Sequence, residues 1–73
     1  MPKVLYYSKT AEGEIVARVY GNRYIVQYRP NTNKSFVPVI QSENGSLECH
    51  YFLSSSVIKL LNHAFKMCKD KVR

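Results

Sequence analysis

Apolar and polar residues alternate along the chain on both sides of Gly21-Asn22. Such alternation is typical of half-buried β-strands, and glycine followed by asparagine fits a two-residue hairpin turn of type II′ or type I′. The turn places Tyr20 opposite Arg23 and, counted outward, Ile15 opposite Tyr28. One face of this predicted hairpin is apolar apart from tyrosine hydroxyl groups, because side chains two residues apart share a face. Its residues are Ile15, Ala17, Val19, Tyr24, Val26 and Tyr28.

The opposite face of the same hairpin is mixed and basic. Glu14 lies opposite Arg29 on this face, in the position of a cross-strand ion pair. Arginine side chains match phosphate oxygens and tyrosine rings offer a surface on which bases stack, so the face is a candidate binding surface for nucleic acid. The candidate residues are Arg18, Tyr20, Arg23, Gln27 and Arg29, with Lys34 in the adjoining loop.

A second hairpin is predicted at Asn44-Gly45, a strong two-residue turn signal between two apolar-rich segments. The count gives these cross-strand pairs on an apolar face: Ile40 with Cys49, Pro38 with Tyr51, and Phe36 with Leu53. The other face then carries Val37, Val39, Gln41, Glu48, His50 and Phe52. Joining the two hairpins through residues 30–34 brings Tyr28 opposite Phe36, so that both apolar faces lie on one side of a single sheet.

The two ends of the chain extend this pattern. A strand around residues 4–7 returns to the first hairpin through residues 10–13. From Ser54 the apolar period changes from the strand repeat to the helical one, and a serine run supplies an N-cap, which predicts a helix from about Ser55 to Lys71. The expected fold is α+β: an antiparallel sheet of about five strands, as a meander or a partly closed barrel, packed by one C-terminal amphipathic helix. No linker or repeat interrupts the pattern, so residues 1–73 are expected to form a single domain.

The solvent face of the predicted helix is also basic. Its cations are Lys59, Lys66, Lys69 and Arg73. Cations near a helix C-terminus interact favourably with the helix dipole, which accounts for part of this cluster. Because Asp70 is the one acid nearby, the cluster exceeds what the dipole requires, and the face is a second candidate surface for phosphate groups.

Several apolar residues fall on the outer side of the predicted sheet, away from the helix: Val16, Ile25, Val37, Val39 and Phe52. One helix covers only one side of a sheet. Either the sheet curls and buries these residues, or a second copy or another protein covers them.

Composition sets the class of partner. Eleven lysine and arginine residues against five acidic ones give the 73-residue chain a formal net charge of +6. This charge favours a polyanionic partner. The chain has neither a signal-peptide pattern nor an apolar run long enough to span a bilayer, so we expect a complete, cytoplasmic protein that does not enter membranes. Its two cysteines are then expected to stay reduced.

Catalytic and metal sites are not expected. Cys49 and His50 are adjacent on a predicted strand and point to opposite faces, and His63 and Cys68 fall on different sides of the helix. The acidic residues are scattered over strands and loops, and the glycines stand alone in turns. We therefore expect neither an enzymatic activity nor a cofactor.

Segment 23–28 is similar to the aromatic strand motif of RNA-recognition domains. Its glycine pattern departs from that motif, and the chain lacks the two-helix βαββαβ order. Strands followed by one C-terminal helix are also similar in order to sheet DNA readers such as integrase arm-binding domains, with no shared motif. No family is therefore assigned.

The leading hypothesis is a small non-enzymatic protein that binds nucleic acid, either DNA or RNA, through its basic sheet and helix faces. Tyr20 and Phe52 are the aromatic residues expected to stack on bases or to pack at the interface. The alternative is a protein-interaction module or inhibitor, of the type that viruses and mobile elements encode, which docks on an acidic partner protein. A homodimer is a further expectation from the outer apolar residues.

Overall fold

A four-stranded antiparallel meander and a separate two-stranded hairpin make up the β-structure of the computed structural model, which describes residues 1–73. The meander has the order β1 (Lys3–Thr10), β2 (Gly13–Tyr20), β3 (Arg23–Arg29) and β4 (Val37–Pro38). The hairpin joins β5 (Ile40–Gln41) to β6 (Leu47–Glu48), and the chain ends in helix α1 (Ser55–Val72). The predicted α+β meander with one C-terminal helix is confirmed. The two predicted hairpins do not share one sheet, however, because β5 and β6 form a sheet of their own, and the meander does not close into a barrel.

The register of the first hairpin is the predicted one. Tyr20 lies opposite Arg23 and Ile15 lies opposite Tyr28, and each pair between them agrees with the count from the turn. Gly21 has a φ of +64°, whereas no residue other than glycine has a positive φ. The turn is therefore of type II′, in which glycine leads, and not of type I′, which needs a positive φ at both central residues.

Strand β1 pairs with β2 along nearly its whole length, from Thr10 opposite Gly13 to Lys3 opposite Val19. A β-bulge interrupts the ladder between Val4 and Tyr6. Because β1 has no partner on its other side, it forms one edge of the sheet.

The second hairpin differs from the prediction by one residue in register. Ile40 pairs with Glu48 instead of Cys49, and Gln41 pairs with Leu47. The Ser42 backbone N–H donates to the Ser46 carbonyl oxygen at 2.8 Å, so the connection is a three-residue loop and not a two-residue turn. Within it, the Asn44 side chain accepts a hydrogen bond from the Ser46 backbone N–H at 3.0 Å. The ladder covers two residues on each strand, so the predicted pairs of Pro38 with Tyr51 and of Phe36 with Leu53 do not form.

A second one-residue shift, between β3 and β4, changes which residues face inward. Val37, not Phe36, lies opposite Tyr28, and Val39, predicted on the outer face, is buried in the core. Pro38 and Ile40, predicted to face inward, are exposed. A one-residue slip moves every side chain of a strand to the other face, which accounts for these differences together.

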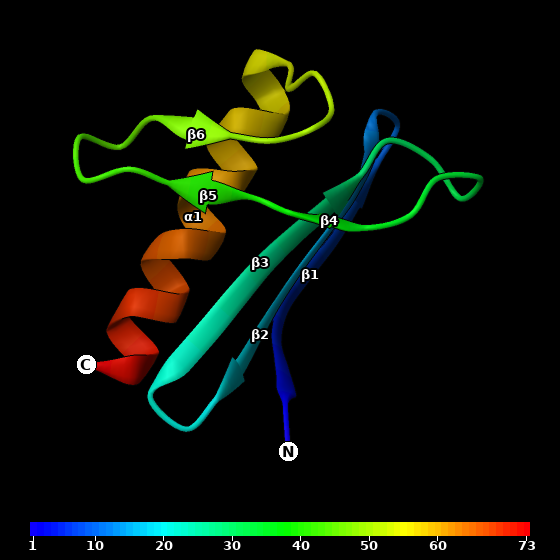
Figure 1. Cartoon of the computed structure of the whole chain (residues 1–73). Coiled ribbons are helices and arrows are strands. Elements are labelled where there is room, and N and C mark those ends of the chain that lie inside the picture. The colour runs from blue at the N-terminus through cyan, green and yellow to red at the C-terminus, as the bar shows by residue number, and fades with distance from the viewer.

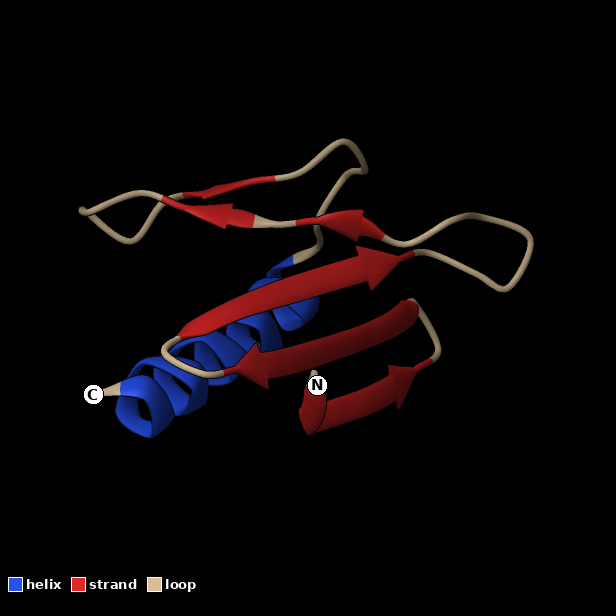
Figure 2. Cartoon of the chain, turned by 60° about the horizontal axis from the view of Figure 1, so that its bottom comes forward, coloured by secondary structure: helices blue, strands red, loops and turns tan.

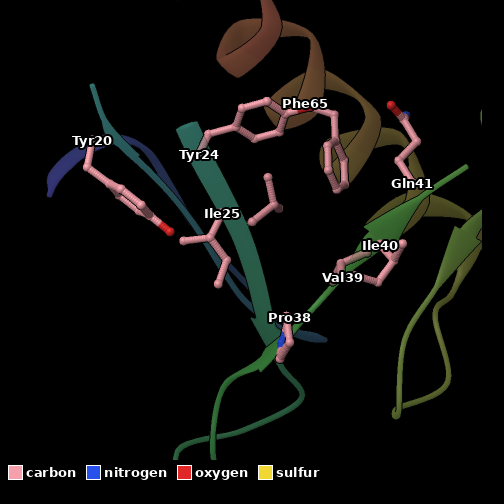
Figure 3. Close-up of a pocket in the computed structure, with 9 residues that line it drawn as sticks. Tyr20, Tyr24, Ile25, Pro38, Val39, Ile40, Gln41 and Phe65 are labelled. Carbon is pink, nitrogen blue, oxygen red and sulfur yellow. The ribbon is translucent and has the colours of Figure 1, made fainter. Parts of the chain in front are cut away.

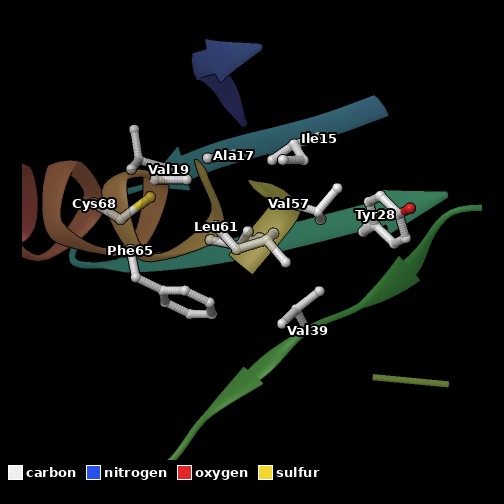
Figure 4. Packing of buried hydrophobic residues seen from close by; sticks show 11 residues of the cluster. Ile15, Ala17, Val19, Tyr28, Val39, Val57, Leu61, Phe65 and Cys68 are labelled. Atoms are coloured by element: carbon white, nitrogen blue, oxygen red, sulfur yellow. The ribbon is translucent and has the colours of Figure 1, made fainter. Parts of the chain in front are cut away.

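The hydrophobic core lies between the sheet and α1, and Val39 closes it from the side of β5 (Figure 4). Its buried residues are Ile15, Ala17, Val19, Val26, Tyr28, Val39, Val57, Leu61, Ala64, Phe65 and Cys68. The helical spacing predicted the buried positions of α1 and the first hairpin predicted those of β2 and β3, whereas Val39 was predicted on the outer face. Figures 1 and 2 show the helix on one side of the long strands, with no other element over their opposite side.

Helix α1 begins close to the predicted residue, because Ser54 is its N-cap and accepts a hydrogen bond from the Val57 backbone N–H at 3.3 Å. The Glu12 carboxylate, in the β1–β2 turn, accepts hydrogen bonds from the hydroxyl groups of Ser54 and Ser56. These bonds, the Ser54 one first, lower the pKa of Glu12. They tie the first turn of the helix to the far end of the sheet.

Candidate nucleic-acid interface

The side of the sheet that faces away from α1, here called the outer sheet face, carries every sheet residue of the predicted binding surface. These residues are Arg18, Tyr20, Arg23, Gln27 and Arg29. The register places them on the side opposite the buried residues of β2 and β3. The face was predicted, but the state of each side chain was not.

Arg29 is paired within the protein along one edge of its guanidinium. Its Nε donates to Glu14 Oε1 at 2.9 Å, one of its terminal nitrogens lies 2.8 Å from the same oxygen, and its guanidinium lies 4.5 Å from the centre of the Phe36 ring. The Tyr7 hydroxyl donates to the other oxygen, Glu14 Oε2, at 2.5 Å. This hydrogen bond, with help from Arg29, lowers the pKa of Glu14, and it raises the pKa of Tyr7. The predicted ion pair is confirmed, and it leaves Arg29 little capacity for a phosphate.

Arg18 is also held, although by a neutral partner. Its Nη1 donates to Gln27 Oε1 at 2.7 Å, and no carboxylate lies within ion-pair distance. Beside this pair Val16, which lies between Tyr7 and Gln27 in the sheet, is only 3% exposed. The long polar side chains therefore cover the outer valine, and neither a barrel nor a second copy is required to bury it.

Arg23 and Tyr20, at the β2–β3 turn, are the free members of the outer sheet face. Arg23 is exposed and makes no ion pair, and Tyr20 is 40% exposed. Lys34 is exposed in the loop between β3 and β4. Phe52, the other predicted stacking residue, is 89% exposed in the segment before the helix.

Four lysines of α1 form no ion pair: Lys59, Lys66, Lys69 and Lys71. Lys59 and Lys66 are exposed and have no carboxylate partner. Lys69 donates to Gln41 Oε1 of β5, a neutral group. Arg73 lies 3.5 Å from Asp70 in an exposed ion pair, the kind that stabilises a helix little.

The two basic surfaces do not form one continuous site, because the outer sheet face and the solvent face of α1 point in opposite directions (Figure 2). They approach each other at one end of the molecule. At this end the loop between β2 and β3, which is followed by Arg23, lies near the C-terminus of α1 (Figures 1 and 2). A bound strand that uses both surfaces has to pass round this end.

The groups capable of other chemistry are dispersed. Cys68 is buried in the core, and loss of solvation raises the pKa of its thiol. His63 lies edge-on to Tyr6, with ring centres 5.4 Å apart, and His50 lies in the same way against Tyr51 at 5.3 Å. No three histidine, cysteine or acidic side chains come close enough together to hold one metal ion.

The chain offers no helix that is both long enough and apolar enough to cross a bilayer. Comparison with protein-family models, with curated proteins and with solved structures finds no match to this chain.

Proposed function

We propose that the protein binds the phosphate backbone of nucleic acid through the solvent face of α1, without enzymatic activity. The observation that supports this proposal is the unpaired state of Lys59 and Lys66, together with Lys69, whose partner is neutral. A lysine that neutralises a phosphate displaces cations condensed on the nucleic acid, and this release is a main source of affinity for a polyanion. A lysine without a carboxylate partner is free to do so.

The outer sheet face has a secondary role in this proposal. Arg29 is neutralised by Glu14 and Arg18 is held by Gln27, so these two arginines would have to break internal bonds to reach a phosphate. Arg23 is free to extend the helix surface round the end of the molecule. Tyr20 beside it offers a ring for stacking when the bound strand is single.

The test is a titration of labelled single-stranded RNA, single-stranded DNA and duplex DNA by fluorescence anisotropy at several salt concentrations. The double variant Lys59→Ala with Lys66→Ala should weaken binding about tenfold or more. It should also reduce the slope of log affinity against log salt by roughly 0.9 for each duplex phosphate that is no longer neutralised. Neither lysine touches the core, so circular dichroism should show an unchanged fold.

The matched control is Lys3→Ala with Lys9→Ala, which removes the same charge from exposed positions on β1. It should leave the salt slope close to that of the unmodified protein. Equal losses in the two double variants would mean that net charge alone attracts the polyanion, and would overturn the proposed site. Absence of binding to all three probes at low salt would overturn the function.

A further inference from the structure

A groove of about 350 Å³ lies beside the first half of β3, where β4 has ended and β5 has turned away (Figure 3). Its volume falls in the range of ordinary ligand sites. The residues that line it are mostly apolar: Tyr20, Tyr24, Ile25, Val26, Pro38, Val39, Ile40, Gln41 and Phe65. None of them carries a formal charge.

One wall of the groove is an unpaired strand edge. β4 pairs with β3 only at Gln27 and Tyr28, and one further bond runs from the Val39 N–H to the Val26 carbonyl oxygen at 2.8 Å. In an antiparallel ladder, alternate residues direct both backbone groups toward the same neighbour. Tyr24, two residues before Val26, therefore directs its N–H and C=O into the groove, where no strand receives them.

The groove is held open by the helix. The register of β4 on β3, continued by two residues past Val39, would place Gln41 opposite Tyr24. Instead, the Gln41 side chain donates to Asn62 Oδ1 at 3.1 Å and accepts from Lys69 Nζ, both on α1. Its backbone pairs with Leu47 of β6. The chain thus leaves β3 at the point where an additional strand could enter.

Side chains on both faces of the β3 edge suit an incoming strand. Tyr24 packs edge-on against Phe65 on the helix side, with ring centres 6.2 Å apart, whereas Ile25 lies on the outer sheet face. On the opposite wall Ile40 is 57% exposed. Figure 3 shows Tyr24 and Ile25 on one side of the groove and Ile40 and Gln41 on the other. An added strand would place alternate side chains against these apolar surfaces.

Charge selects the occupant. Arg23 begins the β3 edge and is exposed, and Lys69 contacts Gln41 on the opposite wall. The nearest acidic residue in the hairpin is Glu48 of β6, which pairs with Ile40 of β5. Glu48 does not line the groove. A second copy of this chain would bring the same cations and its own net charge of +6 to the contact. Arg23 and Lys69 lie toward the same end of the groove, because Gln41 falls opposite Tyr24, so an extended segment with carboxylates toward that end is complementary.

We propose that this groove binds an extended segment of a partner protein, with alternating acidic and apolar residues, which adds a strand to β3 along Arg23–Val26. Backbone hydrogen bonds to Tyr24 would supply affinity, and the apolar walls with Arg23 and Lys69 would supply selectivity. This groove shares Arg23 and Lys69 with the proposed nucleic-acid surface, but Lys59 and Lys66 take no part in it, so variants of these two lysines separate the two activities.

The probe is a fluorescein-labelled heptapeptide of alternating acidic residues and valine or isoleucine, titrated up to millimolar concentration. Saturating peptide should slow amide hydrogen exchange of Tyr24 about tenfold or more, measured by NMR, with little change at Tyr7 on the other edge of the sheet. A second peptide with proline at alternate positions cannot complete the ladder and should not bind. Unchanged exchange at Tyr24, or equal binding of the proline peptide, would overturn the proposal.

Two exposed positions give a matched pair of variants that should both fold. Ile40→Glu places a carboxylate on the groove wall and should weaken peptide binding at least tenfold. Val4→Glu makes the same change at a site that is 51% exposed on β1 and should alter binding less than twofold. Lys59→Ala with Lys66→Ala should leave peptide binding intact even if it abolishes nucleic-acid binding. Equal effects of the two glutamate variants, or a dimer in sedimentation experiments that the peptide dissociates, would contradict the proposed occupant.

Discussion

Of the three glycines, Gly13 is the one where replacement by alanine should destabilise the protein most. It lies at the start of β2, where its backbone has a φ of +155°. A Cβ atom built there would lie 2.4 Å from the carbonyl oxygen of Arg29, and 2.8 Å and 2.9 Å from the Cε1 and hydroxyl oxygen of Tyr28. Ordinary contacts between carbon and oxygen are longer by most of an ångström. Gly13→Ala therefore forces β2 and β3 apart or twists the turn between β1 and β2.

The cost has two parts. Holding a residue other than glycine in this region of backbone conformation costs about 1–3 kcal/mol. Overpacking against atoms that cannot yield adds about 1–3 kcal/mol, because one of them belongs to the backbone of β3. A domain of this length has a free energy of unfolding of roughly 4–11 kcal/mol. Gly13→Ala should therefore remove about half of the stability, and each kcal/mol lowers the melting temperature by about 4–8 °C.

Urea denaturation followed by circular dichroism measures this loss, with Gly21→Ala as the control. Gly21 also has a positive φ, of +64°, but a Cβ atom there would meet nothing within 4 Å. The control should therefore lose only the conformational cost, about 1–2 kcal/mol. If Gly13→Ala were no less stable than Gly21→Ala, the close approach of β3 to Gly13 would not be a feature of the folded protein.

Further predictions concern titration, capping and thiol reactivity. The pKa of Glu14 is lowered in the folded state, so its contribution to stability is complete above the unfolded pKa of about 4.3 and is lost as the pH falls through the folded value. Urea midpoints should fall on acidification below about pH 5, and Glu14→Gln should flatten this dependence; an unchanged profile would exclude Glu14 as a source. Ser54→Ala should cost about 0.5–2 kcal/mol by thermal denaturation through loss of the helix cap, whereas the exposed Ser55→Ala should cost much less. In folded protein, an aromatic disulfide reagent should label half-buried Cys49 well before buried Cys68, and mass spectrometry that finds equal labelling rates would contradict the burial of Cys68.

The parts of the fold that were predicted correctly are those set by local signals. The turn at Gly21-Asn22 fixed the whole β2–β3 register, and the serine run with its apolar period fixed the start of α1. The second hairpin was predicted in the wrong register, because Ser42 and Ser46 close a three-residue loop in place of the two-residue turn that was expected. Sequence alone does not distinguish that loop from a two-residue turn at the same Asn-Gly pair.

In the candidate site, too, the features set by local signals were predicted and those set by contacts between distant segments were not. Alternation placed Arg18 and Arg29 on the outer sheet face, but their availability depends on side chains from other segments. Tyr7 and Phe36 complete the environment of Arg29, and no local pattern indicates how either segment meets it. The groove was not predicted, because it exists only where β5 leaves β3 to bond with the helix through Gln41.

The bulge in β1 has a consequence for self-assembly. Open sheet edges of matching shape join molecule to molecule, and regular ladders then grow into fibres. β1 is a poor edge of this kind, because the bulge between Val4 and Tyr6 shortens its regular part to Tyr6–Thr10 and exposed Lys3 and Lys9 place like charges along it. A strand from another protein that adds to β3 therefore extends the sheet on one side only, because β1 on the other side does not pair readily with a further molecule. The sheet can accept one guest strand and still resist polymerisation.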